Sequence, residues 1–84
     1  MRTYIKTVRY QGHNIEIKAL VWEKIFYDGK EVSNKLSLTG TTHSFRVMED
    51  GEEVHYEVTI GTRWHCLSWW AEAKRKGETI YTDR

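Results

Sequence analysis

The fold is decided by residues 24–60, KIFYDGKEVSNKLSLTGTTHSFRVMEDGEEVHYEVTI. This stretch contains two Asp-Gly pairs, Asp28-Gly29 and Asp50-Gly51, and a glycine-threonine pair at 40–41 between them. Each pair lies between runs rich in β-branched and aromatic residues, which favour strands. Asp-Gly in this setting indicates a two-residue hairpin turn, because a type I′ turn needs positive φ at both central residues. The stretch therefore predicts antiparallel strands that fold back on one another.

Upstream of this stretch, residues 3–22 read as another hairpin, with its turn at Gly12-His13. In that register Val8 faces Ile17, and the apolar side chains of both strands gather on one face. A slip of one residue would scatter the apolar set, so the pattern supports the pairing.

A long strand is expected over residues 30–39, followed by a turn at Gly40-Thr41. Leu36 falls on the inner face of that strand. Asn34 falls on the same face, which predicts a bulge or a hydrogen-bonded amide near it.

Downstream, the turn at residues 50–51 places Phe45 opposite Tyr56. A further turn at Gly61-Thr62 would place Tyr56 opposite Leu67. Residues 68–75 fit either a strand or a two-turn helix, and alternation of apolar residues favours the strand. A turn at residues 76–77 then leads into a last strand over residues 78–82.

These strands predict a single all-β domain over residues 1–84, an antiparallel meander of seven to eight strands. Such a meander must curl into a flattened barrel or form a β-sandwich, because a flat sheet leaves its edges and one side of the core open. The core residues expected from this register are Tyr4, Val8, Ile15, Ile17, Val21, Val32, Leu36, Leu38, Phe45, Val47, Val54, Tyr56, Val58, Leu67 and Trp69.

Composition excludes several classes of protein. The formal net charge is +1, which argues against a strong sequence-independent phosphate binder. Cys66 is the single cysteine, so no internal disulfide can form. The first residues carry frequent charges and resemble no signal peptide, and no run is long enough to cross a membrane. We expect a cytoplasmic protein with no cofactor and no membrane partner.

Three segments, residues 12–17, 24–32 and 35–47, resemble the β-domain of the Fas apoptotic inhibitory molecule family. The family shows the same order of a G-x-H-x-I-E strand start, a V-Y-V-x-G-K-E-V hairpin and a K-L-x-G-x-x-x-F-x-V strand. Small uncharacterised bacterial proteins are similar as well. The segment Trp64–Arg75 departs from the family pattern. The resemblance implies a compact antiparallel β-sandwich without known catalytic residues, and it transfers no site.

Side chains that could carry chemistry form no recognisable site in the sequence. His43 and His65 are expected on either side of Val58, but no metal-binding spacing accompanies them. Cys66 would lie beside Glu57, a carboxylate that raises a thiol pKa and so disfavours the thiolate. We therefore expect neither a metal site nor an enzyme.

The four tryptophans are the most unusual feature of the composition. The predicted register sends two of them to the outer face, where either a second sheet covers them or they form an exposed patch. An exposed aromatic patch would dock a protein partner or a second copy of the chain. The predicted function is a non-enzymatic protein-binding or scaffolding module. Its expected partner-binding residues are Trp64, Trp70, Arg46, His55, Glu53 and Glu57.

The alternative is a single-stranded nucleic-acid-binding β-barrel. Aromatic residues interleaved with Arg63 and the basic run Lys74-Arg75-Lys76 could stack bases. Charge runs at turns are usually solvated, so we favour the protein-binding interpretation and do not expect nucleic acid as the partner.

Overall fold

The computed structural model describes residues 4–19, 22–36, 40–63 and 68–83. These residues form eight antiparallel strands, and nowhere within them is there a helix long and apolar enough to span a membrane. The all-β fold predicted from the sequence is confirmed. The strands are β1 (Tyr4–Tyr10), β2 (His13–Ala19), β3 (Trp22–Tyr27), β4 (Lys30–Leu36), β5 (Gly40–Glu49), β6 (Glu52–Arg63), β7 (Ser68–Arg75) and β8 (Glu78–Thr82).

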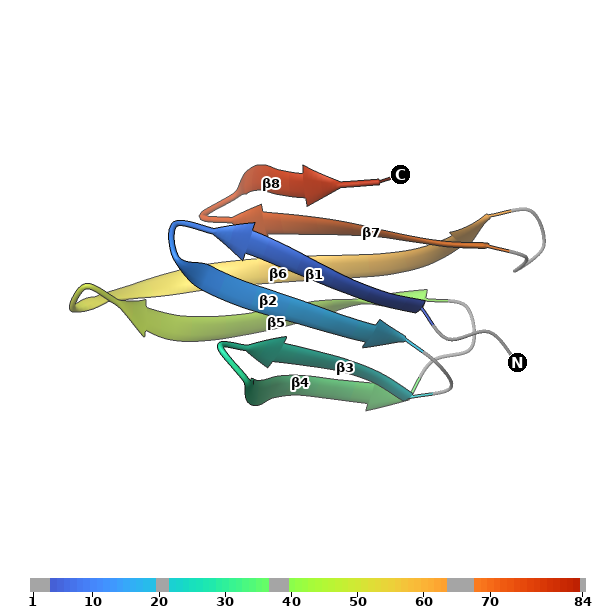
Figure 1. Ribbon diagram of the computed structural model, residues 1–84, viewed down its shortest axis with the longest axis horizontal. Coiled ribbons are helices and arrows are strands. Elements are labelled where there is room, and N and C mark those ends of the chain that lie inside the picture. The colour runs from blue at the N-terminus through green and yellow to red at the C-terminus, as the bar shows by residue number, and fades with distance from the viewer. Residues whose placement is uncertain (1–3, 20–21, 37–39, 64–67, 84) are drawn as a thin grey trace.

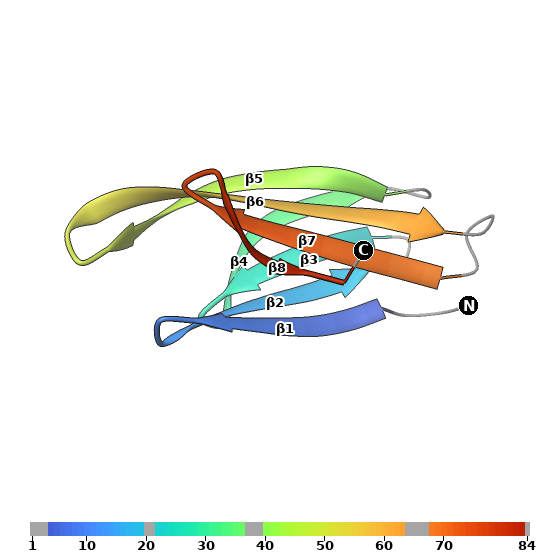
Figure 2. The ribbon, with the colours of Figure 1, turned by 90° about the horizontal axis from the view of Figure 1, so that it is seen from above.

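The strands form two four-stranded sheets, ordered β1-β2-β3-β4 and β5-β6-β7-β8, that pack face to face (Figures 1 and 2). The fold is thus a β-sandwich built from two successive meanders. The prediction of one continuous meander is therefore corrected to two, one in each sheet. The predicted turn at Gly40-Thr41 does not form, because Gly40 begins β5 and β4 belongs to the other sheet.

The four hairpin turns in the described part of the chain lie at one end of the sandwich (Figure 1). Both residues of each turn have positive φ and the second is always glycine, as type I′ geometry requires: Gln11-Gly12, Asp28-Gly29, Asp50-Gly51 and Lys76-Gly77. The last three were predicted. The first turn comes one residue earlier than predicted, so Val8 faces Ile15. This change moves the pairing by two residues. Because side chains alternate between the faces with a period of two, the same apolar side chains still lie on one face.

The register of the second sheet was predicted correctly only in its first hairpin. Phe45 lies opposite Tyr56, as expected. On the other side of β6, Tyr56 lies opposite Arg75 and not Leu67. The expectation that 68–75 is a strand is confirmed, and Ala71 and Ala73 face the core.

The error at β6 comes from Gly61-Thr62, which lies within a strand that continues to Arg63. Threonine is β-branched and disfavours the positive φ of a tight turn. Gly61 instead makes room for Trp70: a Cβ added to Gly61 would lie 2.3 Å from Trp70 Cζ2. The glycine thus allows close packing of an indole ring on the strand.

A bulge in β4 changes which side chains face the core. The pairing with β3 shifts just after Ile25, which lies opposite Ser33, so Val32 is the extra residue. The bulge expected near Asn34 therefore occurs two residues earlier. Beyond it, Ser33 faces the core, whereas Leu36 faces solvent with 61% of its surface exposed. The prediction that Leu36 is a core residue was wrong, because a bulge reverses the alternation of a strand.

The remaining core predictions largely hold. The buried ones are Val8, Ile15, Ile17, Phe45, Val54, Tyr56 and Val58, and Val32, Val47 and Trp69 pack partly buried against them. Val21, Leu38, Leu67 and the side chain of Tyr4 lie outside the described part of the chain. The buried residues absent from the predicted core list are Ala19, Ile25, Tyr27, Ile60, Ala71, Ala73 and the polar Glu23, His43 and Glu49.

Candidate functional site

The predicted partner-binding patch is only partly assembled. Arg46 lies opposite His55 on the outer face of the second sheet, and Arg46 Nη1 lies 3.9 Å from Glu53 Oε1. All three side chains are exposed. Glu57 lies one step further along the same face of β6, opposite Lys74 of β7. These residues form a mixed-charge surface without an aromatic centre.

Trp70 lies away from that charged surface. It is opposite Gly61, six residues from His55 along β6, which corresponds to about 20 Å at the rise of an extended strand. Its ring packs on Gly61 and is partly buried. Trp64 lies outside the described residues. The structure therefore does not bring Trp70 together with the other predicted patch residues.

The basic residues at the last turn, Lys74-Arg75-Lys76, form ion pairs with nearby carboxylates. Arg75 Nη2 lies 2.6 Å from Glu49 Oε1, and Lys76 Nζ lies 2.6 Å from Glu52 Oε1. Lys74 faces the outer side of the sheet. Its Nζ lies 3.9 Å from Glu72 Oε2, so all three cations are paired within the chain, which weakens the case for a phosphate-binding strip here.

Only some of the histidine and cysteine residues considered in the sequence analysis lie in the described part of the chain. His43 lies opposite Val58 on the inner face, as expected, and is fully buried, whereas Ala73 takes the place expected for His65 on the other side of Val58. His65 and Cys66 lie outside the described residues. Among the residues that the structure does describe, no three His, Cys, Asp or Glu side chains are grouped to hold a metal ion.

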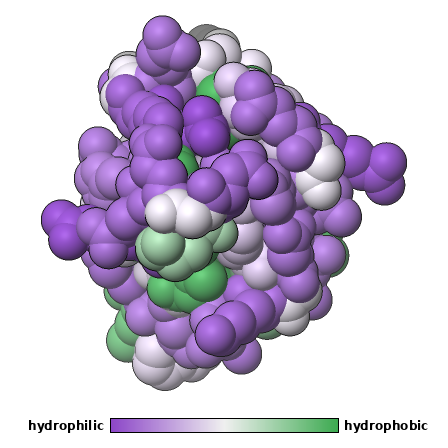
Figure 3. All heavy atoms as spheres, turned by 90° about the vertical axis from the view of Figure 1, so that its left-hand side faces the viewer, coloured by the Kyte–Doolittle hydropathy of each residue, from purple (hydrophilic) through white to green (hydrophobic). Residues whose placement is uncertain are grey.

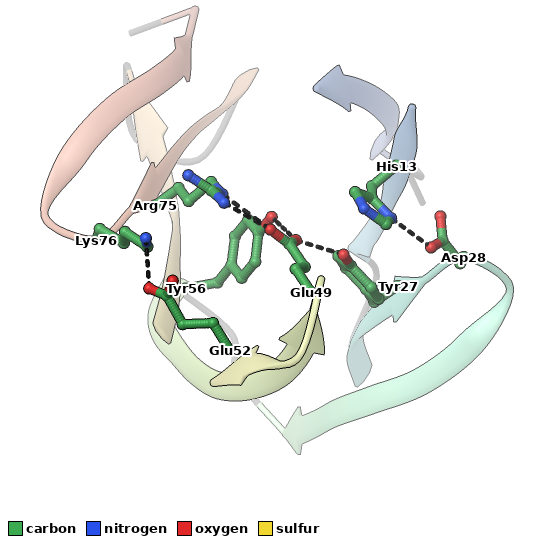
Figure 4. Close-up of polar contacts among 8 residues, drawn as sticks. All are labelled: His13, Tyr27, Asp28, Glu49, Glu52, Tyr56, Arg75 and Lys76. Atoms are coloured by element: carbon green, nitrogen blue, oxygen red, sulfur yellow. Dashed lines mark hydrogen bonds and ion pairs between the residues drawn. The ribbon is translucent and has the colours of Figure 1, made fainter. Parts of the chain in front are cut away.

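A buried carboxylate, Glu49, lies among the hairpin turns and was not predicted as a functional position. It ends β5 and accepts hydrogen bonds from the hydroxyls of Tyr27 and Tyr56 on Oε2 (Figure 4). Arg75 donates to Oε1 from Nε at 3.1 Å and from Nη2 at 2.6 Å. Four donors from both sheets thus converge on one carboxylate.

The convergence of donors fixes the charge of this cluster. Burial alone would raise the pKa of Glu49, but hydrogen bonds from Tyr27, Tyr56 and Arg75 outweigh it and lower the pKa to about 2. Burial and the bond to Glu49 raise the pKa of Tyr56 to about 12. At neutral pH the cluster is therefore an ionised Glu–Arg pair flanked by two neutral phenols.

Two further contacts surround the cluster at the same end of the sandwich. His13 stacks on Tyr27 at 5.2 Å between ring centroids, and its Nδ1 lies 2.8 Å from Asp28 Oδ2. The backbone N–H of Asn14 donates to Asp28 Oδ1 at 2.8 Å. The hydrogen bond to Asp28 raises the pKa of His13. These bonds tie the first two turns together.

A second buried polar cluster joins the sheets through His43. Its Nε2 lies 3.0 Å from Glu23 Oε1 and its Nδ1 lies 2.7 Å from Ser33 Oγ. Because a carboxylate only accepts, Nε2 carries the proton and Nδ1 accepts from Ser33. Burial lowers the pKa of His43 although Glu23 opposes this. Serine, histidine and glutamate occur here as an internal bridge, since His43 and Glu23 are fully buried.

The open surface features lie along β5. A hollow of about 370 Å³ is lined by residues from the β3–β4 hairpin and from the end of β5, among them Val32, Val47 and Met48. A second hollow of about 400 Å³ is lined by Ser44, Phe45, Arg46 and His55. Viewed from the end that carries the turns, the surface has a small apolar area enclosed by hydrophilic side chains (Figure 3).

The fold and these features define an antiparallel β-sandwich with two buried polar clusters and a hollowed strand edge. No family model, curated protein or solved structure matches the chain. The resemblance to the Fas apoptotic inhibitory molecule family stays a prediction.

Proposed function

We propose that the protein is a non-enzymatic protein-binding module. The observation that carries this proposal is the edge of the second sheet: among the described strands, β5 pairs with β6 alone, and hollows lie beside it. Edge strands of this kind are templates for association unless they are covered or charged. Met48, at the end of this edge, has 65% of its surface exposed.

The hydrogen bonding of the buried polar groups supports a binding function over a catalytic one. A general base or nucleophile must reach a substrate with a free lone pair or proton. Glu49 is occupied by four internal donors, and both ring nitrogens of His43 are bonded inside the core. These groups therefore stabilise the sandwich, and contacts with a partner are made by residues on its surface.

Peptide panning tests the proposal. A library of random dodecapeptides selected on the immobilised protein should yield binders that lose about tenfold or more in affinity for a Met48→Asp variant. Ile5→Asp is the matched control, since Ile5 is 60% exposed on another edge strand, β1. Circular dichroism verifies that both variants fold. A library that yields no binder, or binders that ignore Met48 and require Ile5, would contradict the proposal.

Self-association through the Trp64/Trp70 face remains part of the protein-binding proposal. Light scattering on a Trp64→Ser/Trp70→Ser double variant tests it. A dimeric wild type that becomes monomeric without losing its fold would support that face, and a monomeric wild type would exclude it.

A second candidate function, single-stranded nucleic-acid binding, has one observation in its favour. Trp22 is 54% exposed on the outer face of the first sheet, and Lys24 follows on the same face, opposite Lys18 of β2. Exposed aromatic rings beside cations can stack bases. Titration with oligothymidine at low salt should quench tryptophan fluorescence in the wild type and less in Trp22→Phe. An absence of quenching removes this candidate.

A further inference from the structure

The backbone of β5 offers unpaired hydrogen-bonding groups in a defined order. In an antiparallel hairpin with a two-residue turn, the residues next to the turn form a hydrogen-bonded pair, and bonded pairs then alternate with non-bonded ones. Glu49 and Glu52 flank the turn, so Met48, Arg46 and Ser44 direct their N–H and C=O groups away from β6. Lys35 confirms this alternation, because its Nζ donates to the outward C=O of Thr42 at 2.7 Å.

The outward groups of β5 differ in how far they are covered. Near the start of the strand, Lys35 of β4 caps Thr42. Toward the turn, the β5–β6 hairpin projects beyond the other hairpins in both views (Figures 1 and 2). Within the described chain, β6 is the single strand paired with β5. The free edge therefore consists of Ser44, Arg46 and Met48.

The two hollows lie along this free edge and share Arg46 in their linings. The first opens toward the β3–β4 hairpin, where Val32 and the inward side chain of Val47 supply apolar walls and Lys30 lies at the rim. The second lies where Ser44, Arg46 and His55 project from the outer face. Side chains of an added strand would alternate between the inner and the outer face of the second sheet.

The other sheet edges are less open. β4 carries the bulge at Val32, and β8 has five residues and a register shift of its own. β1 is approached by the second sheet, because Lys6 lies 5.8 Å from the ring centroid of Tyr81. Bulges, short strands and charged side chains are the devices that protect sheet edges.

We propose that an extended peptide segment of another protein adds to β5 as a fifth strand of the second sheet. The segment places an apolar side chain in the hollow formed by Val32, Val47 and Met48, and carries a carboxylate that meets Arg46 or Lys30. This inference rests on the proposed function and specifies its mode, which is recognition by strand addition.

Charge decides between such a peptide and a second copy of the chain. Arg46 is the middle residue of the free edge, so two copies pairing antiparallel about their free edges would place Arg46 opposite Arg46. Like charges directly opposite one another destabilise a strand pair. A carboxylate on a strand from a different protein is instead attracted to Arg46. Lys30 of the same hollow adds to this attraction, whereas Glu53, which also lines it and lies 3.9 Å from Arg46, opposes it.

Two synthetic nonapeptides, acetylated and amidated, test the inference by NMR on the ¹⁵N-labelled protein. One alternates valine with glutamate and the other alternates valine with lysine. We expect the acidic peptide to slow amide exchange at Ser44, Arg46 and Met48 and to bind about fivefold more tightly than the basic one. Arg46→Glu should reverse this preference, whereas Arg9→Glu on β1 should leave it unchanged.

Each other outcome contradicts strand addition to β5. Protection confined to β1 amides, or no binding of either peptide at about 1 mM, overturns it. Retained binding after N-methylation of alternate peptide amides overturns it as well, because methylation removes backbone donors. Panned peptides that require Met48 but leave amide exchange at Ser44, Arg46 and Met48 unchanged would overturn strand addition and leave the protein-binding function standing, so the two proposals fail separately.

Discussion

Replacing Glu49 with glutamine tests whether the buried cluster holds the two sheets together. The substitution keeps the shape of the side chain and removes its charge. Arg75 then lacks its ionic partner, and the amide N–H₂ group of the new residue meets donors already directed at this position. Breaking a buried, hydrogen-bonded ion pair from one side is strongly destabilising, because it leaves the other charge uncompensated.

The magnitude follows from the pKa of Glu49. Lowering it from its ordinary value of 4.5 to about 2 stabilises the folded state by about 3 kcal/mol at neutral pH. Direct losses on breaking buried ion pairs are about 3–5 kcal/mol, which agrees. A domain of 84 residues has a free energy of unfolding of about 4–12 kcal/mol. We therefore expect Glu49→Gln to lower Tm by roughly 12–24 °C.

Urea unfolding followed by tryptophan fluorescence measures the effect at pH 7 and then across the acid range. Because the folded pKa of Glu49 is depressed, its contribution is complete above the unfolded pKa and is lost as pH falls from about 5 to 2. The free energy of unfolding of the wild type should decrease over that range, and the part of this decrease that comes from Glu49 should be absent in the variant. Glu52→Gln is the matched control, since Glu52 forms an equally short but exposed ion pair with Lys76 and should change little.

Two results would refute this reasoning. One is a Glu49→Gln variant whose stability at pH 7 matches that of the Glu52→Gln control. The other is a wild type and variant whose stabilities fall in parallel between pH 5 and 2, because the depressed pKa of Glu49 would then contribute nothing.

Three further predictions concern packing and the buried polar groups. Gly61→Ala should destabilise the fold by about 1–3 kcal/mol in urea unfolding, because the new Cβ overlaps Trp70, and an unchanged or higher stability would contradict the packing. Tyr27→Phe should cost about 1–3 kcal/mol by the same measurement, since a buried carboxylate loses one donor, and a neutral result would contradict that bond. His43 should stay neutral below pH 6.5 in an NMR titration, and stability should decline as pH falls below that value, because the unfolded chain takes up the proton first. A normal titration of His43 would show that its burial beside Glu23 is not maintained.

The turns show how much of the fold the sequence predicts. Asp28-Gly29, Asp50-Gly51 and Lys76-Gly77 place a glycine at the second turn position, where positive φ is required, and all three form turns. Gly40-Thr41 and Gly61-Thr62 put a β-branched residue there, and both pairs lie within strands. The order of the pair, glycine second, distinguishes the turns from the strand glycines. Reading Gly61-Thr62 as a turn shifted the whole β6–β7 pairing.

That register error also concealed the Glu49 cluster. The sequence shows Glu49 and Glu52 as like charges opposite each other at a turn, which is unfavourable unless cations approach. The basic run that supplies those cations, Arg75 and Lys76, is visible further along the chain. Its position beside the acidic pair depends on where β7 begins, and local pattern does not specify this. The free edge of β5 was concealed by a related error, because reading Gly40-Thr41 as a turn paired residues 30–39 with the strand that follows.

Because each meander forms one sheet, each sheet is built from one continuous half of the chain, and the two halves can be treated as separate fragments. Every backbone ladder joins strands that are consecutive in sequence, so residues 4–36 contain one complete sheet and residues 40–83 the other. The two halves adhere through side chains, through the buried bridges at His43 and Glu49, and through Lys35. Separately expressed halves should accordingly reconstitute the sandwich on mixing, and fusing each half to a different protein would turn the molecule into a proximity reporter.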